Sequence, residues 1–472
     1  MKTRLLLLVC LLACWTVAGY AAGDKKPKDM RILYLAGNSD WNADAVEKSV
    51  IEENVAQRKE AFGGLLRKYF GEVAVMDAAD YSPEMSEGYD VTVFDGLPPA
   101  LEPRREEHDP ATGKTKYIPA RYLPDDFDAP CVTIGVVSAQ IGERIGVKND
   151  WFCLCLDACA HHLREGHPIF HGPFKVSLTF EEQPTPDDAF YYQHQFDEPI
   201  PKSLPMWRVQ TKGYRTDMRF NMGLVSHPWG YEDSPEAEYI SGGVSTKSPD
   251  AVAIGRHGNF LHWGFIASPL YMTEEAKVVF ANAVAYIAQF RGPILARRFD
   301  GYMPTRTTVK DMRYLNSHAA YNDELKFLNN MKHLQDSLYG ALAERQAKGE
   351  KLGAQEEVFL KGYQPMEVQM PPFEAYLQGK ADPALFEQFG ADEEKYARYY
   401  DENAPYFYGG GGSLVLDEDA KAWGIPNNDK RLLDKAISCL EEGVETERAQ
   451  RVLSRYTLCA FATPAEWRKW YD

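Results

Sequence analysis

The chain has 472 residues, of which 44% are hydrophobic and 26% are charged, and its formal net charge is −17. This length allows two or three domains, and the composition is that of an ordinary globular protein. The acidic excess argues against nucleic acid as a partner, because phosphates require a basic surface, and against electrostatic binding to anionic membranes.

The first 23 residues have the pattern of a secretory signal peptide, with Lys2 and Arg4 before an apolar run and small residues near its end. The run is too short to cross a bilayer, and no later segment is long and apolar enough to do so. A second interpretation is a lipoprotein signal, in which Cys14 of the LLAC sequence would carry the lipid. We expect export to a bacterial periplasm or envelope, with or without a lipid anchor, and a polar linker at 24–29.

From Met30 onward, apolar strands alternate with helices. The pattern predicts a helix at 44–69 and strands at 31–37, 73–78, 90–96 and 131–138. Such alternation favours a parallel sheet with crossover helices, and therefore an α/β layer. The stretch 97–129 is rich in proline and charge and is expected to be a surface excursion.

Residues 150–163 (DWFCLCLDACAHHL) have apolar residues at helical spacing and predict a helix capped by Asp150. We interpret its cysteines as core residues, because buried free cysteine behaves as a small hydrophobic group. The other interpretation is a metal site, since Cys155, Cys159 and His162 would share one side of this helix. No second cysteine pair completes such a site, so we favour no metal and predict no cofactor.

Residues 173–250 contain many aromatic residues and prolines and predict an irregular, β-rich insertion. A hairpin is expected over 251–265, followed by a helix over 273–290 that Thr273 caps. Beyond about residue 300 the pattern becomes helical, with a long amphipathic helix at 322–346. The last helix opens with a capping box at 463–466.

Several of these features together resemble the ThuA-like branch of the class I glutamine amidotransferase-like superfamily, over about residues 30–295. They are the first strand with its long helix, the strand at 131–138, His-Pro-Ile at 167–169, and the block HGNFLHWGFIASPLYMTEEAKVVFANAVAYI. The resemblance implies a flavodoxin-like three-layer sandwich with a mostly parallel sheet at 30–296, and a mainly helical domain at 297–472. ThuA-like proteins are linked to the metabolism of oxidised disaccharides, which implies a carbohydrate context.

Amidotransferases of this fold carry a nucleophilic cysteine in a sharp strand-to-helix turn of the form G-x-C-x-G. The matching run here is GVVSA at 135–139, which places Val137 at the position of the cysteine. Valine cannot attack a carbonyl. A shift to Ser138 would leave no glycine after it to permit the strained turn. We therefore expect that the chain does not hydrolyse glutamine.

Ligands of open parallel sheets bind beyond the carboxyl ends of the strands. The ends here carry amides, carboxylates, hydroxyls and an aromatic ring, a mixture that suits a sugar. We predict a carbohydrate site there, with Asp40 or Asp95 as candidate acid or base. The alternative is that these polar residues only form turns. His194 and residues 227–229 are further candidates to close over the rim. The predicted ligand-binding residues are Asn38, Asp40, Trp41, Asp95, Ser138, Gln140 and Ser268.

Three functions remain open, and the sequence does not decide whether the chain is an enzyme. The first is an exported ThuA-like protein that binds or processes a small carbohydrate at the strand ends. The second is a catalytically silent envelope scaffold whose C-terminal helices dock a protein partner. The third is a metal-dependent hydrolase that uses the Cys/His cluster.

Overall fold

The computed structural model describes residues 25–39, 47–108, 115–147, 152–153, 156–196, 198–211, 225–226, 234–245, 251–294, 305–410 and 413–472, with a few single positions between these ranges. The expected signal peptide with Cys14 lies outside the described residues. The same holds for Asp40, Trp41, Cys155 and residues 227–229.

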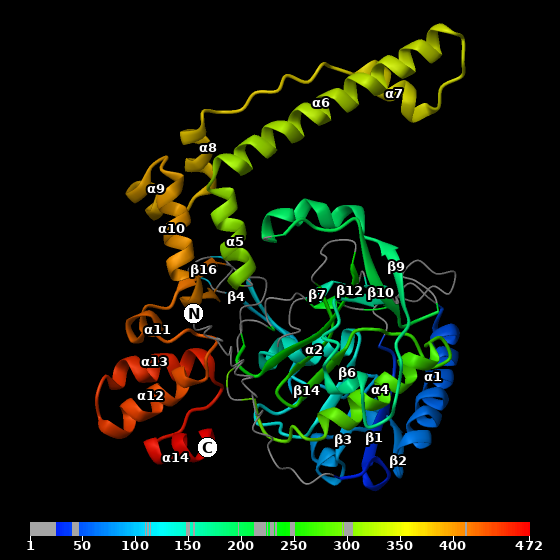
Figure 1. The fold of residues 1–472 in the computed structure, drawn as a ribbon, viewed down its shortest axis with the longest axis vertical. Helices are drawn as coiled ribbons and strands as arrows, with labels where there is room; N and C mark the ends of the chain where they lie inside the picture. The colour runs from blue at the N-terminus through cyan, green and yellow to red at the C-terminus, as the bar shows by residue number, and fades with distance from the viewer. Residues whose placement is uncertain are drawn as a thin grey trace, which may run out of the picture.

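A large mixed sheet forms the centre of the N-terminal part (Figure 1). Its strand order is β2-β1-β3-β6-β14-β13-β12-β8-β10-β9. The first five strands of this order are parallel, and the others continue the sheet antiparallel. The parallel strands are β1 (Arg31–Ala36), β2 (Glu72–Asp77), β3 (Val91–Phe94), β6 (Cys131–Ile134) and β14 (Phe260–Trp263), and the antiparallel ones are β8 (Leu156–His161), β9 (Phe180–Pro184), β10 (Ser203–Arg208), β12 (Ala237–Ser245) and β13 (Val252–His257).

Helices cover both faces of the parallel strands. One apolar core joins α1 (Lys48–Tyr69) and α4 (Glu274–Ile287) to the face that carries Tyr34 and Trp263. A second core joins α2 (Val136–Ile145) to the opposite face, which carries Leu35 and Phe94. Strands covered on both sides must be apolar at every position, and β3, β6 and β14 are buried along their whole length. The predicted α/β class is confirmed, but the sheet is mixed rather than mostly parallel, because the strands from β13 to β9 extend it antiparallel.

The helix predicted at 150–163 is wrong. Two strands occupy this stretch instead, β7 (Phe152–Cys153) and β8, and β8 pairs with β12 on one side and β10 on the other. A short run of small apolar residues fits a fully buried strand as well as a helix, and the pairing partners decide between them. Those partners belong to the region 173–250, which contributes β9, β10 and β12 to the central sheet.

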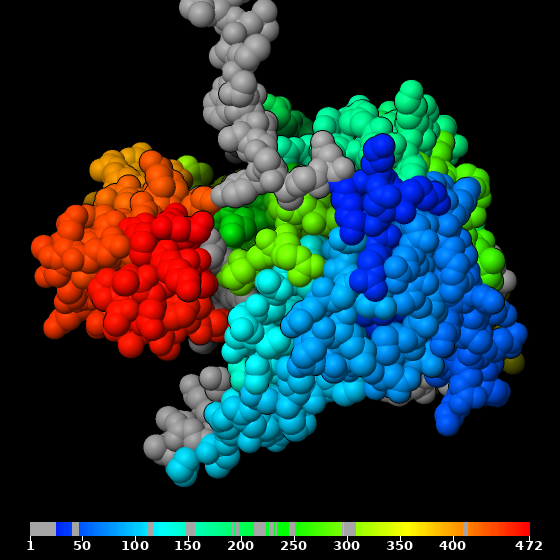
Figure 2. Space-filling view, turned by 90° about the horizontal axis from the view of Figure 1, so that it is seen from below, coloured from blue at the N-terminus to red at the C-terminus, as the bar shows by residue number. Residues whose placement is uncertain are grey.

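The excursion at 97–129 carries a hairpin of β4 (Arg105–His108) and β5 (Thr115–Ile118). Figure 2 shows it projecting from the body of the molecule. The predicted hairpin at 251–265 is confirmed as β13 and β14, and the helix that Thr273 caps is confirmed as α4.

The C-terminal part is mainly helical, as predicted. Its long helix α6 extends with α7 as an arm away from the sheet, and α11 to α14 form a compact group beside the α/β part (Figures 1 and 2). Within the described residues, no helix combines the length and apolar character that crossing a bilayer requires. The elements are α5 (Thr305–Leu315), α6 (His318–Ala347), α7 (Ala354–Gly362), α8 (Phe373–Lys380), α9 (Pro383–Phe389), α10 (Glu393–Asn403), β15 (Phe407–Gly410), β16 (Ser413–Leu416), α11 (Glu418–Trp423), α12 (Arg431–Glu442), α13 (Thr446–Tyr456) and α14 (Pro464–Tyr471).

Candidate functional site

The carboxyl ends of β1 and β3 and the segment after β14 meet around one guanidinium group, that of Arg58 on α1. Arg58 forms a bidentate ion pair with Asp95: its Nε donates to Oδ2 at 3.0 Å, and its Nη2 donates to Oδ1. Its Nη2 donates to Ser39 Oγ at 2.9 Å, and its Nη1 donates to the Ile266 carbonyl at 2.5 Å. Three segments that are far apart in the sequence are therefore joined by a side chain of the protein itself.

Asp95, predicted as a ligand and a candidate acid or base, is fully engaged in this network. Its carboxylate also accepts a hydrogen bond from the Tyr34 hydroxyl at 2.8 Å, and burial together with the nearby Asp95 charge raises the pKa of Tyr34 well above its ordinary value. Asp95 is 0% exposed and Arg58 is 4% exposed. A buried carboxylate with its acceptor sites taken by strong donors is a structural ion pair rather than a group open to substrate.

Within the described residues, the chain segments that follow β1 and β3 touch each other at two glycines. A Cβ atom on Gly37 would lie 2.5 Å from the Cα of Gly96, so glycine is required where these two segments touch. The signal for Arg58 was present in the sequence. It stands three residues after Val55 and four before Phe62, inside the apolar stripe of the predicted helix, and a charge there needs a buried partner.

The strand-to-helix turn differs by two residues from the prediction. Its tip is Gly135, which has φ 55° and ψ −130° between β6 and α2, a conformation that favours glycine. A Cβ at this position would lie 2.5 Å from Cγ1 of Ile266 and 3.3 Å from the Ser39 carbonyl oxygen. Val137, the residue that aligns with the nucleophile of the amidotransferases, lies in the first turn of α2 and is buried in the core. The tip of the turn has neither a nucleophile nor space for one.

Ser138 belongs to a buried polar cluster rather than to the strand-end surface. Its Oγ lies 2.6 Å from Thr133 Oγ1 and 2.8 Å from His262 Nδ1, and it is 1% exposed. This is a serine–histidine pair, but both side chains are enclosed between α2 and the sheet, where a substrate carbonyl has no access. The pair therefore links α2 to β6 and β14.

The remaining predicted ligand residues differ in their roles and in their exposure. Ser268 accepts a hydrogen bond from the Leu270 backbone at 3.2 Å, which is the turn role given as the alternative. Asn38 and Gln140 are half-buried near the strand ends. His194 contacts α5, with Nε2 2.8 Å from Asp311 Oδ1 and its ring stacked on Tyr314.

The Cys/His stretch does not have the geometry on which the metal interpretation rested, because the shared helix face does not exist. Cys159 is buried beside Leu204 and Met206. His161 is 2% exposed, its Nδ1 lies 2.7 Å from that of His162, and burial and the neighbouring ring lower its pKa to about 3. Within the part of the chain that the structure describes, no group of three or more His, Cys, Asp or Glu side chains is arranged to hold a metal ion.

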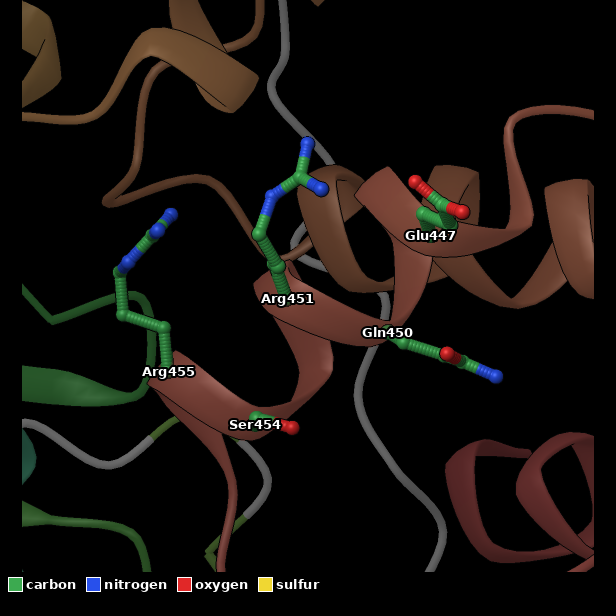
Figure 3. A pocket seen from close by; sticks show the side chains of 5 residues that line it. All are labelled: Glu447, Gln450, Arg451, Ser454 and Arg455. Carbon is green, nitrogen blue, oxygen red and sulfur yellow. The ribbon is translucent and has the colours of Figure 1, made fainter.

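An open groove with a volume of about 630 Å³ lies along α13. In Figure 3 the side chains of Arg451 and Arg455 leave this helix in a common direction. Arg451 pairs with Asp419 at 2.7 and 3.0 Å, and Arg455 pairs with Asp417 at 2.7 Å. Because acidic residues at the start of α11 already neutralise both cations, the groove does not present an open anion site. It is lined by Glu447, Gln450, Arg451, Ser454 and Arg455.

Comparisons with known proteins add little. No protein-family model matches the chain, and no curated protein matches it. Among solved structures, the chain is similar to a putative ThuA-like protein from Bacteroides uniformis ATCC 8492. The alignment covers 57% of this chain and 95% of that one, at 11% identity and a TM-score of 0.29. Such a low score carries no argument about function, so what the structure defines is an α/β protein with a large mixed sheet and a helical C-terminal part.

Proposed function

We propose that this chain is an exported, non-catalytic binding protein, in which a ThuA-like, flavodoxin-like α/β part is a scaffold and the helical arm docks a protein partner. Two observations support a flavodoxin-like fold for the α/β part. In chain order, the five parallel strands follow the sequence 2-1-3-4-5 across the sheet, which is the flavodoxin-like doubly wound order, and helices pack on both faces. The charged and apolar start of the sequence supports export.

The scaffold function is favoured over carbohydrate processing because the strand-end corner is filled by the protein's own groups. Arg58 and Asp95 neutralise each other there, and Ile266 packs over the tip of the turn at Gly135. Acid–base or nucleophilic catalysis requires a side chain that can reach a substrate. Among the described strand-end residues that were predicted to bind a ligand, Asn38 and Gln140 keep partial exposure.

The observation that carries the proposal is an uncovered apolar face on α6. Phe327 is 55% exposed, Leu334 is 63% exposed and Leu338 is 48% exposed. Single exposed apolar residues are normal on protein surfaces, but a continuous row of large ones marks an interaction surface. Their spacing of seven and four residues places all three on one side of the helix.

The experiment that tests the proposal is photo-cross-linking in the native cells. A photo-reactive residue at Leu334 is expected to give a protein adduct, whereas the same residue at Asn329, exposed on another side of α6, is expected to give none. Equal adducts at the two positions, or none at Leu334, would contradict a docking role for this face.

The carbohydrate function can be tested on the purified chain by a thermal-shift screen with mono- and disaccharides. We expect no change in the unfolding temperature, because Arg58, Asp95 and Ser39 are buried and bonded to one another. A saccharide that raises this temperature, with an effect lost in Asn38→Ala and Gln140→Ala, would restore carbohydrate binding as the function.

A further inference from the structure

We propose that the partner docked by α6 is a second copy of this chain, and that the two α6 helices pair antiparallel as a short coiled coil. The inference rests on the proposed function, because it names the partner of the same apolar face. Three features of α6 favour a second copy: the spacing of its apolar residues, the faces that other elements of the chain cover, and the charges at the two ends of the apolar row.

The apolar row follows the alternating spacing of four and three residues that defines a coiled-coil seam. We call this row the α6 seam; its members are the exposed Phe327, Leu334, Leu338 and Ala341 and the half-buried Met331. Glu324 and Arg345 continue the same spacing at its two ends, so the seam with its ends extends for about 30 Å along the helix. An amphipathic helix that packs on a globular core has a wider apolar stripe, whereas a narrow row of this kind suits one facing helix.

The neighbouring face of α6 is already covered from within the chain. Leu342 is 3% exposed, Tyr339 stacks on Tyr363 after α7 with ring centroids 4.1 Å apart, and Tyr321 meets Tyr376 of α8 at 5.3 Å. These contacts hold α6 helical in the single chain. The cost of ordering a helix, which usually makes short coiled coils weak, is therefore met before a partner binds.

The seam is complementary to itself when the second copy runs in the opposite direction. When Met331 of one copy lies opposite Leu334 of the other, Phe327 lies opposite Leu338. The two-fold axis between the helices repeats both pairs, so the centre of the dimer has four apolar layers. Such an interface closes on itself and yields a dimer rather than a chain of copies.

Charge selects the antiparallel orientation over the parallel one. Glu324 and Arg345 occupy the same heptad position at opposite ends, so an antiparallel pair brings Glu324 of one copy within about one turn of Arg345 of the other. A parallel pair would set like charges against each other at both ends. Glu324 is 40% exposed beside Lys380, and Arg345 is 39% exposed beside Glu350 and Glu356, so each charge is partly compensated within its own chain. The same holds for Asp323 and Glu344, which would approach each other at the edge of an antiparallel pair and which contact Tyr314 and Lys348. The end charges therefore add a preference for the antiparallel orientation to the apolar layers that hold the pair together.

The test is the mass of the full mature chain in solution, measured by sedimentation velocity over a wide range of concentrations. We expect the chain to shift from one copy to two as concentration rises.

The double variant Leu334→Glu/Leu338→Glu is expected to stay a single copy, because four carboxylates would face one another in the seam of a dimer. The matched control Asn322→Glu/Asn329→Glu adds the same charges on another side of α6 and is expected to dimerise normally. Helical circular dichroism verifies that both variants are folded.

Orientation is tested by cysteine pairs under oxidising conditions. Phe327→Cys/Leu338→Cys is expected to form a disulfide-linked dimer, whereas Phe327→Cys alone is not, because its two copies would lie about 16 Å apart along the axis. Linkage of the single variant would show a parallel pair and overturn the proposed arrangement.

The two proposals fail in different ways. A chain that remains single at every concentration overturns the second copy as partner. If the cross-link from Leu334 then joins a different protein, the docking function stands with another partner. If Leu334 yields no adduct, the docking function fails as well.

Discussion

The strand-end corner and the α6 arm distribute polar and apolar groups in opposite ways. Around Arg58, polar side chains are buried and bonded to one another, whereas on α6 large apolar side chains face solvent. A site for a small polar ligand needs polar groups that are open, and a docking surface needs apolar groups that are open. The comparison teaches that the polar groups at the strand-end corner are used in contacts within the domain, while large apolar side chains on the helical arm remain open to solvent.

The largest expected effect comes from breaking the buried pair at the corner. Arg58→Met leaves the Asp95 charge buried without its partner, and we expect the free energy of unfolding to fall by about 3–5 kcal/mol in urea denaturation. The neighbouring Lys59→Met removes an exposed ion pair with Asp77 and is expected to cost less than about 1 kcal/mol.

The double variant Arg58→Met/Asp95→Asn is expected to recover part of that loss, because the stranded charge is removed. If Arg58→Met were no more costly than Lys59→Met, the corner would be open to solvent. The contrast with the arm would then disappear.

A second buried polar network surrounds Glu238, and we expect its contribution to the free energy of unfolding to depend on pH. Glu238 is 15% exposed and contacts Arg256 at 2.9 Å, Tyr286 at 2.8 Å and His167 at 3.3 Å. Burial by itself would raise the pKa of Glu238, but the hydrogen bond from His167 and the charge of Arg256 outweigh it and lower this pKa from 4.5 to about 2.

Because the folded-state pKa is the lower one, the stabilisation by Glu238 is complete above pH 4.5 and is lost as the pH falls toward 2. We expect Glu238→Gln to lower the free energy of unfolding by about 2–3 kcal/mol at neutral pH, with a smaller difference from the parent chain at pH 3. Urea denaturation at both pH values measures this. An equal loss at the two pH values would show that the charge of Glu238 plays no part.

The smallest effect is expected on the arm. Leu334→Glu/Leu338→Glu, measured on dilute single chains, is expected to change the free energy of unfolding by no more than about 0.5 kcal/mol per site, because neither side chain is buried. Leu377→Ala in α8 removes a leucine that is 0% exposed and is expected to cost about 2–5 kcal/mol. Similar losses in both variants would mean that the α6 seam packs within the single chain.

Sequence predictions were correct where the signal lay within a single helix or strand, and they failed where the structure depended on contacts between distant segments. The apolar run RILYLA predicted β1, the Thr273 cap predicted α4, helical periodicity predicted α6, and the capping box at 463–466 predicted α14, because these signals lie within one element. The strand predicted at 131–138 ends at Ile134, since Gly135 turns the chain into α2. The helix predicted at 150–163 failed because the strands that pair with β8 lie more than forty residues away in the sequence.

For the candidate site as well, the sequence predicted the local features but not the contacts between distant segments. The sequence identified the strand ends as the place where polar residues gather, because the carboxyl ends of parallel strands meet at one edge of a sheet. It did not show that a helix residue, Arg58, would neutralise Asp95, or that Ile266 would cover Gly135, since these contacts join segments up to about two hundred residues apart.

By itself, the sequence determined the α/β class, the helical character of the C-terminal part and the amphipathic pattern along α6. These properties follow from hydrophobic periodicity, which acts within a few turns or a single strand. Only the tertiary structure decided which groups are buried and which are exposed. Burial depends on the neighbours that the whole chain brings together, and it turns a polar corner into a closed ion pair and leaves an apolar row on α6 uncovered.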